Sequence, residues 1–354
     1  MSVTRKTLRQ TIARRIGDFR LGTATGGTTT TLLDSARTET TTNNWTGHLY
    51  VTSGALADTE LDIISYTTGQ FTFAQQATSL AAGMTYELWS IWRPTDVNEA
   101  INIALRNAYP AWFTESIGDK LVVCEEKLEY TLPTMTELLN AYIERCDEYF
   151  SGEATSGTTS SLTDSTQSWT TNAYAGWHCV IYDGTGAGQY ALVASNTATA
   201  LSLTTTGYNW TVAPDTTSKY MLKDELEVTR DKYRLGAWYT VPRKNPTTLY
   251  LTTTYPEGMY IRLHYITQHA DLTADTGTTD VPVEYIVNKA IAELYLMRTN
   301  DIGFEHAETY AGKAAQHQAL ADRFAELHHM RYPPVTMRRE SETWTPGYPA
   351  DWPF

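Results

Sequence analysis

The chain has 354 residues, with 27 Lys and Arg against 40 Asp and Glu, and a formal net charge of -13. Its 42% of hydrophobic residues excludes a collagen-like or largely disordered chain. The acidic balance argues against a general nucleic-acid binder, which needs cations to neutralise phosphates. No run of 18 apolar residues and no apolar N-terminal stretch occurs, so we expect neither a membrane partner nor a signal peptide. The 59 threonines and 23 tyrosines favour β-strands.

The N-terminal residues 4–19 predict a short amphipathic helix. Leu8, Ile12 and Ile16 recur at every fourth position and give it one apolar side, with Phe19 just beyond. Against the single acid Asp18, residues 1–20 carry six cations: Arg5, Lys6, Arg9, Arg14, Arg15 and Arg20. Such a basic helix can meet an acidic partner surface or nucleic acid passing nearby, and a merely solvated face is an equal alternative.

Residues 21–92 read as short strands separated by Thr/Gly turns, and helix signals return at Thr95. Asp96 and Glu99 have the spacing of a capping box, and Pro110 stops the helix. Its apolar stripe consists of Val97, Ile101, Ala104, Leu105 and Ala108. Residues 119–131 alternate as a pair of strands would, whereas residues 135–150 fit either a helix or a turn followed by a strand.

The chain repeats itself at an offset of 130 residues, where GTATGGTTTTLLDS at 22–35 aligns with GEATSGTTSSLTDS at 152–165. The match continues with a slightly drifting offset, pairing residues 47–51 with 176–180, 71–73 with 201–203, and 86–88 with 220–222. Each copy has room for about six short strands, which predicts two homologous small barrels or sandwiches. Because stacked repeats must be contiguous to share a core, two separated copies indicate insertions into a host domain.

After the second copy, strands are expected at 226–233, 237–242, 248–254 and 259–264. A loop at 271–280 leads to Pro282, a proline suited to a helix start, and a second helix is expected over 304–327. The first of these helices has an apolar side at Val287, Ile291, Leu294 and Met297. The second has a small-sided face at Ala307, Ala311, Ala314, Ala315 and Ala321, with Leu320, Phe324 and Leu327 as larger anchors.

The last residues, 329–354, contain five prolines and the aromatic anchors Trp344, Tyr348, Trp352 and Phe354. Such a segment forms no core of its own, so it stays flexible or docks as an extended arm on a neighbour.

The sequence therefore predicts an α+β fold, in which a host domain of helices and strands carries two inserted all-β modules. The expected divisions are a basic helix at 1–20, module copy 1 at 21–92, host domain at 93–150, module copy 2 at 151–222, host domain at 223–328 and the arm at 329–354.

The residues that carry chemistry form no catalytic pattern. None of the eight histidines has metal-ligand spacing, and Cys124, Cys146 and Cys179 form neither a zinc pattern nor a disulfide framework. His178 and Cys179 are adjacent on a strand and would point to opposite faces, so we expect a packed cysteine beside an exposed or rim histidine.

Two further patterns also have structural explanations. The glycine-rich residues 183–188 lack the lysine of a phosphate loop and are better explained as a hairpin turn. The acidic pairs at 125–126 and 147–148 are adjacent, whereas glycosidase carboxylates face each other across a cleft. We therefore expect no enzyme, no cofactor, and no catalytic, cofactor-binding or metal residues.

Three features of the sequence together carry a resemblance to a known family. They are the basic N-terminal helix, the Gly-Thr-Ala-Thr-x-Gly-Thr-Thr-Thr-x-Leu-x-Asp-Ser motif and residues 272–286 before the C-terminal helix pair. They resemble structural proteins of tailed bacteriophages, in particular the neck or head-tail adaptor (connector) proteins below the portal. The similarity spans nearly the whole chain, and its motifs are compositional.

That resemblance implies a ring of about twelve copies with a helical bundle on the portal and β-domains directed outward or toward the tail. It implies the portal and a tail-side neck or tail-tube protein as partners, and passage of DNA through the lumen without specific binding. The expected location is the virion neck, after assembly in the host cytoplasm.

An alternative of another class is a tail or capsid-decoration protein whose modules bind host-surface carbohydrate. Exposed indoles of Trp45, Trp169, Trp177 and Trp210 would then form sugar platforms, whereas a purely structural role buries most of them.

Overall fold

The computed structural model describes residues 2–40, 45–117, 119–144, 149–204, 210–224, 232–235, 238–301 and 304–330. The described fold is mixed α+β and mostly β, with a C-terminal helix pair. The chain forms two compact units, unit 1 from Met1–Phe113 with Gln268–Tyr332 and unit 2 containing Thr114–Thr267. The helices and the later strands, which the sequence assigned to one host domain, therefore lie in different units.

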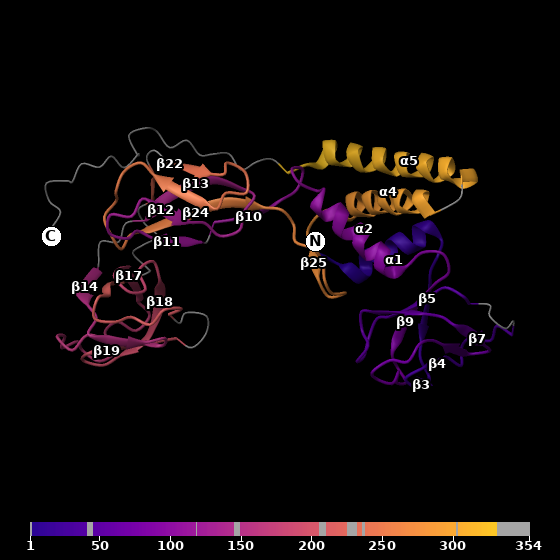
Figure 1. Cartoon of the computed structure of the whole chain (residues 1–354), viewed down its shortest axis with the longest axis horizontal. Coiled ribbons are helices and arrows are strands. Elements are labelled where there is room, and N and C mark those ends of the chain that lie inside the picture. The colour runs from indigo at the N-terminus through magenta and orange to yellow at the C-terminus, as the bar shows by residue number, and fades with distance from the viewer. Residues whose placement is uncertain are drawn as a thin grey trace. The chain divides into compact units, whose positions relative to one another are not determined.

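Unit 1 contains the helices of the described chain (Figure 1), which are α1 (Arg5–Ile16), α2 (Pro94–Arg106), α4 (Val283–Asp301) and α5 (Phe304–His328). All four lie where the sequence predicts them. The hydroxyl of Thr4 caps α1 by accepting a hydrogen bond from the amide of Thr7, and Gly17 ends the helix in the left-handed region at φ 77. Just before α1, β1 (Val3–Thr4) pairs with β25 (Thr278–Thr279).

The capping box expected for α2 is wrong. The helix begins at Pro94 with Arg93 as its N-cap, and no side chain of the N-cap residue caps it. Instead, the carboxylate of Glu60 in the first β-module accepts hydrogen bonds from the amide and hydroxyl of Thr95, at 3.0 and 2.7 Å. A module residue distant in sequence thus replaces the local cap.

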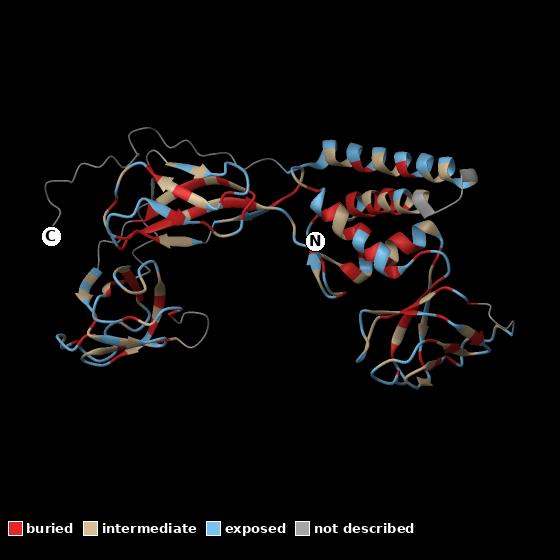
Figure 2. Cartoon of the chain, viewed as in Figure 1, coloured by how far each residue is buried: buried red, intermediate tan, exposed pale blue. Residues whose placement is uncertain are grey.

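The core of unit 1 surrounds α4, which contacts α1, α2 and α5. The apolar sides predicted for the helices meet in this core, with Ile12, Ile101 and Ile291 almost completely buried. The outermost helix, α5, is largely exposed, as Figure 2 shows. Its alanines do not share one face, because Ala314 and Ala321 are buried whereas Ala311 and Ala315 are exposed.

Each sequence repeat folds into the same arrangement of strands. Copy 1 contains β2 (Arg20–Thr23), β3 (Gly26–Gly27), β4 (Thr31–Leu33), β5 (His48–Val51), β6 (Thr59–Asp62), β7 (Ser65–Thr67), β8 (Gln70–Thr72) and β9 (Thr85–Trp89). Copy 2 contains β14 (Tyr149–Glu153), β15 (Ser156–Thr158), β16 (Ser161–Thr163), β17 (His178–Asp183), β18 (Tyr190–Asn196), β19 (Ala200–Leu203) and β20 (Lys219–Lys223).

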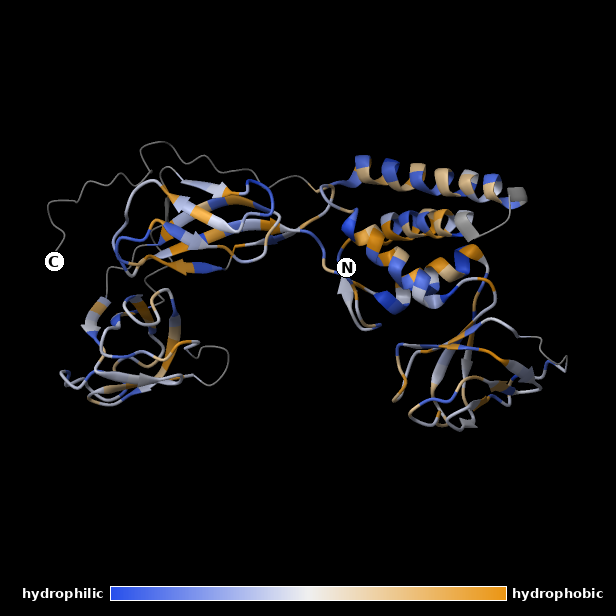
Figure 3. Ribbon diagram, in the orientation of Figure 1, coloured by the Kyte–Doolittle hydropathy of each residue, from blue (hydrophilic) through white to orange (hydrophobic). Residues whose placement is uncertain are grey.

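The strands of the two copies pair antiparallel in the same order, as two four-stranded sheets in copy 1 and as one seven-stranded sheet in copy 2. In copy 1, β2 and β3 are consecutive segments that pair with β9 and β4, while β6 and β7 pair with β5 and β8. In copy 2, the single bulged strand β18 takes the place of β6 and β7 and pairs with both β17 and β19. In Figure 3 the ribbons of both modules are largely pale, as threonine-rich strands of intermediate hydropathy should be.

Pairing also corrects the alignment of the repeats. Val51 pairs with Tyr86 and Ile181 pairs with Tyr220, so Val51 corresponds to Ile181 and His48 to His178. The offset of 130 therefore continues through this strand, and the match of 47–51 with 176–180 was one residue out.

The residues that make the repeat recognisable in the sequence have structural roles. In copy 2 the hydroxyl of Tyr220 donates to the buried carboxylate of Asp164 at 2.8 Å, and Gly152 leaves room for that ring, since a Cβ there would lie 2.6 Å from the hydroxyl oxygen. Copy 1 repeats the arrangement with Tyr86 and Asp34 at 2.5 Å. Each aspartate also accepts a backbone amide two residues later, which turns the chain after the strand.

The rest of unit 2 contains two sheets around one core. The larger consists of β10 (Thr114–Ser116), β11 (Lys120–Val122), β13 (Glu137–Glu144), β21 (Lys232–Arg234) and β24 (Tyr260–Thr267). The smaller has the order β12 (Glu129–Thr131), β23 (Thr248–Leu251) and β22 (Trp238–Val241). The ambiguous segment 135–150 thus contains a strand, and β11 and β12 pair with other strands rather than with each other. Most of the strand expected at 226–233 lies outside the described residues.

Candidate functional site: two joints that hold the modules

Both modules attach to their neighbours through the same outer face of two corresponding strands. In copy 1, Tyr50 and Glu87 are cross-strand partners on this face of β5 and β9. In copy 2, Val180 and Met221 are the corresponding pair on β17 and β20. We call the contacts around Tyr50 and Glu87 the first joint, inside unit 1, and those around Val180 and Met221 the second joint, inside unit 2.

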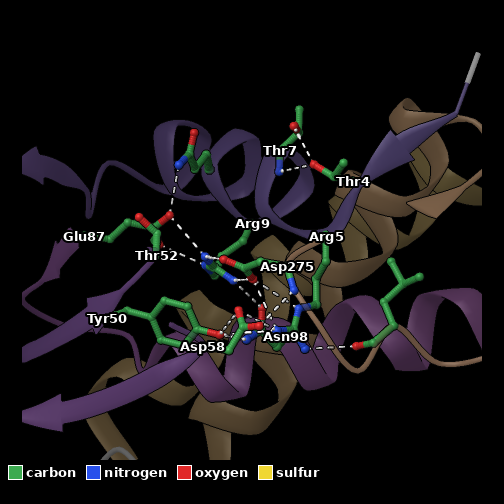
Figure 4. A network of polar contacts seen from close by, with 12 residues as sticks. Thr4, Arg5, Thr7, Arg9, Tyr50, Thr52, Asp58, Glu87, Asn98 and Asp275 are labelled. Carbon is green, nitrogen blue, oxygen red and sulfur yellow. Dashed lines mark hydrogen bonds and ion pairs between the residues drawn. The ribbon is translucent and has the colours of Figure 1, made fainter. Parts of the chain in front are cut away.

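The first joint is centred on the guanidinium of Arg9 from α1 (Figure 4), which is fully buried. Arg9 donates to both carboxylate oxygens of Glu87 at 2.9 and 3.1 Å, and to both oxygens of Asp275 at 2.5 and 2.7 Å. It also donates to Asn98 of α2 at 3.1 Å and lies 4.1 Å from the centre of the Tyr50 ring. One side chain thereby joins α1, the module, α2 and the loop before α4.

Arg5, one helical turn earlier, binds the edge of the same cluster. It donates to the carbonyl of Leu272 at 3.0 Å and to the carboxylate of Asp58 at 3.2 Å. Its contact with Asp275 is 3.2 Å. Two cations thus face the three carboxylates of Asp58, Glu87 and Asp275, and the surplus negative charge lies at Asp58, whose side chain is 32% exposed.

The arginines determine the ionisation of this cluster. Burial by itself would raise the pKa of Asp275, but hydrogen bonds and charge from Arg9, together with the charge of Arg5, hold that pKa below its ordinary value. Burial raises the pKa of Tyr50 to about 12, although the two arginines oppose the rise, so its hydroxyl stays protonated at neutral pH. The joint is therefore an ion-pair network in which Asp275 is charged and the Tyr50 hydroxyl is neutral at neutral pH.

This burial corrects one interpretation of the basic N-terminal helix. Arg5 and Arg9 are inside unit 1 and cannot meet an acidic partner or nucleic acid. Arg15 pairs with Glu284 at 2.8 Å, and Arg20 lies over the Trp45 ring at 5.2 Å. Counting cations could not reveal this, because the carboxylate partners are far away in sequence.

The second joint has different chemistry on the same module face. Val180 packs with Val122 of β11 and Tyr260 of β24. Nδ1 of the buried His178 lies 3.1 Å from the Tyr260 hydroxyl, and the ammonium of the buried Lys223 lies 4.7 Å from the Tyr260 ring centre and donates to the carbonyl of Gly258. The exposed or rim position expected for His178 is therefore wrong, because the module face is covered by the sheet.

The structure gives structural roles to the remaining residues that were considered for catalysis or phosphate binding. Cys179 is buried as expected, and burial raises the pKa of its thiol, which keeps it protonated and unreactive. Residues 184–189 form the turn between β17 and β18 as predicted, with the amide of Ala187 donating to the carbonyl of Gly184 at 3.1 Å. Glu125 pairs with Lys219 at 2.9 Å, while residues 146–148, with the third cysteine and the second acidic pair, lie outside the described residues.

One cluster in the described chain has the composition of a metal site: His48, Glu60 and Asp62 on β5 and β6. The guanidinium of Arg93 already supplies a cation there, 2.8 Å from Glu60 and 3.2 Å from Asp62. The arrangement therefore serves as an ion-pair cluster at the start of α2.

The tryptophans offer few sugar platforms. Trp45, Trp169 and Trp210 are buried in the cores of the two modules, and Trp177 is half-buried against Tyr174 at a ring distance of 5.0 Å. The structure therefore removes three of the four indoles that the carbohydrate alternative requires.

Comparison of the chain with models of protein families, with characterised proteins and with solved structures gave no match. In the part of the chain that the structure describes, every helix is too short or too polar to cross a bilayer.

Proposed function

We propose that the chain is a structural subunit of a tailed-bacteriophage virion, a head-tail adaptor or neck component. In this proposal about twelve copies form a ring that joins the portal to a tail-side neck or tail-tube protein. The protein assembles in the host cytoplasm and remains in the virion neck. It performs no catalysis and has no cofactor, and DNA passes its acidic lumen without specific binding because fixed anions repel phosphate.

The observation that best supports an assembly role is the use of the buried charges. Arg5, Arg9 and Asp275 hold a module against helices, and Lys223 and His178 lie in the corresponding joint of the other module. Buried ionic groups are expensive, and here they fix the orientation of neighbouring parts. The residues 272–286, on which the resemblance to adaptors partly depends, supply Asp275 to this joint.

A ring also needs exposed surface for contacts between subunits. Helix α5 leaves Leu320 and Leu327 exposed by 47% and 67%, and Ala311 and Ala315 lie on its exposed side. We expect this helix and residues 329–354 to contact neighbouring subunits or the portal.

Electron microscopy of the chain, alone and mixed with a portal protein, tests the proposal together with localisation in the particle. Rings of roughly a dozen copies at the head-tail junction are expected. A location only at the distal tail or on the capsid surface would contradict it, and binding of either module on a glycan array would favour the carbohydrate alternative instead.

A further inference from the structure

The outer face of the small sheet in unit 2 carries an exposed aromatic pair. Tyr239 of β22 and Tyr250 of β23 are cross-strand partners, and their rings stack 5.0 Å apart with planes 6° from parallel. Tyr239 is 52% exposed, and Val241 on the same face is 48% exposed. Trp238 packs instead against the core between the sheets. We call Tyr239, Val241 and Tyr250 the tyrosine face.

Two features of the tyrosine face point to the class of ligand. Within the described residues, neither tyrosine hydroxyl has a hydrogen-bond partner, so both are available to donate. Among the same residues, the exposed cations Arg243 and Lys244 follow β22 without a carboxylate partner. Flat aromatic rings with free hydroxyl donors suit a polyproline II segment, which presents rigid pyrrolidine rings and unpaired carbonyl acceptors.

The sequence of this chain contains a proline pattern typical of such ligands, outside the described residues. Residues 341–354 include Pro346-Gly-Tyr-Pro349, in which two prolines are spaced as in PxxP ligands. The same stretch contains the acids Glu342 and Asp351 and no Lys or Arg, so its charge is complementary to Arg243 and Lys244. Proline limits the backbone before binding and thereby lowers the entropy cost of docking.

We propose that the tyrosine face binds residues 341–354 of a second copy of this chain, with Pro346 and Pro349 against the two rings. The acids of the arm then lie near the cations after β22. The inference rests on the proposed ring, in which each copy would clasp the next.

Photo-crosslinking in the full chain tests the contact. The probe p-benzoylphenylalanine replaces Tyr239, and in a control variant it replaces Ile64, which is 66% exposed in unit 1. The chain is prepared as a mixture of 15N-labelled and unlabelled copies. The expected result is a crosslink from position 239 to a peptide within 341–354, with mixed-isotope pairs, and no such crosslink from position 64.

Matched variants identify the chemistry. Pro346→Ala with Pro349→Ala should reduce the crosslink at least about fivefold, as should Arg243→Glu with Lys244→Glu, while Arg338→Ala in the preceding part of the arm should leave it unchanged. Circular dichroism confirms that each variant is folded.

Crosslinks confined to one copy, or the absence of crosslinks in assembled rings, would overturn the proposed contact between copies. Neither result would contradict the proposed function. Mixed-isotope crosslinks in a protein that never forms rings would support the clasp and overturn the proposed ring instead.

Discussion

A single side chain, Arg9, connects four parts of unit 1, and its burial determines what its loss would cost. Its guanidinium contacts two carboxylates, an amide and an aromatic ring. Such a network gains little over an apolar packing of equal volume, but removal of one partner leaves charges without compensation.

Arg9→Met should therefore lower the free energy of unfolding of unit 1 by about 3 to 5 kcal/mol, because Glu87 remains buried without a counter-ion and Asp275 keeps only Arg5. Urea denaturation followed by circular dichroism measures the change. Arg14→Met is the matched control on the same helix, and since Arg14 is exposed it should shift stability by less than about 0.5 kcal/mol. Equal effects of the two substitutions would show that the joint does not stabilise the unit.

The lowered pKa of Asp275 predicts how the stability of unit 1 responds to acid. Its pKa is lower in the folded than in the unfolded chain, so the unfolded chain binds more protons as the pH falls. The stabilisation is complete above the unfolded pKa and is lost progressively below about pH 4. Denaturation midpoints between pH 3 and pH 7 should fall steeply at the acid end.

Two variants, each of which replaces one carboxylate by its neutral amide, isolate the contribution of Asp275. Asp275→Asn should flatten the acid limb of the profile and lower stability at pH 7. Glu284→Gln removes the exposed carboxylate that pairs with Arg15 and should leave the limb unchanged. An identical acid limb in wild type and Asp275→Asn would exclude Asp275 as its source.

At the scale of elements, a glycine, a tyrosine and an aspartate pack together in each copy of the module. Gly152 lies on β14 opposite Tyr220, whose burial and bond to Asp164 raise the pKa of the phenol. The same bond and those from Thr166 and Gln167 lower the pKa of the carboxyl against the effect of burial. The ring can reach the carboxylate only because residue 152 has no side chain.

Gly152→Ala should consequently destabilise module copy 2 by about 1 to 3 kcal/mol, since the new methyl group overlaps the Tyr220 ring. Gly312→Ala is the control, because open space surrounds a Cβ at that position of α5, and it should stabilise the helix by up to about 1 kcal/mol. Thermal unfolding followed by tyrosine absorbance reports on both. A neutral Gly152→Ala would contradict the close packing of this module.

The elements also show how far local sequence patterns reach. Periodic apolar residues located all four described helices, and the turn residues located the strands β22, β23 and β24. Sequence reasoning left 135–150 open because its apolar spacing fits both periods, and pairing of β13 with β24 decides for a strand. It missed β10, a three-residue strand that exists only because β24 is beside it.

At the scale of the whole molecule, the chain forms two compact units, and residues 331–354 are not among the residues that the structure describes. The arm is rich in proline and aromatic residues, and a segment of this composition is not expected to form a core of its own. If the arm serves only contacts between copies, its removal should abolish assembly and leave the fold of each copy intact.

Deletion of residues 331–354 should leave the melting temperature within about 2 °C of that of the full chain, because a segment so rich in proline is not expected to form a core of its own. The same deletion should abolish rings in native mass spectrometry and electron microscopy. Normal ring assembly after the deletion would refute a clasp by the arm, and a large drop in melting temperature would place the arm inside the fold.

The sequence by itself determined the helices, the repeat and the likeness of the two modules, because these depend on local periodicity and on residues that recur in order. It also indicated that Cys179 is packed and that residues 183–188 form a turn. Only the tertiary structure decided the roles of Arg5, Arg9, His178 and Lys223. Their partners come from segments far apart in the chain, and neither composition nor spacing records which charges fold against one another.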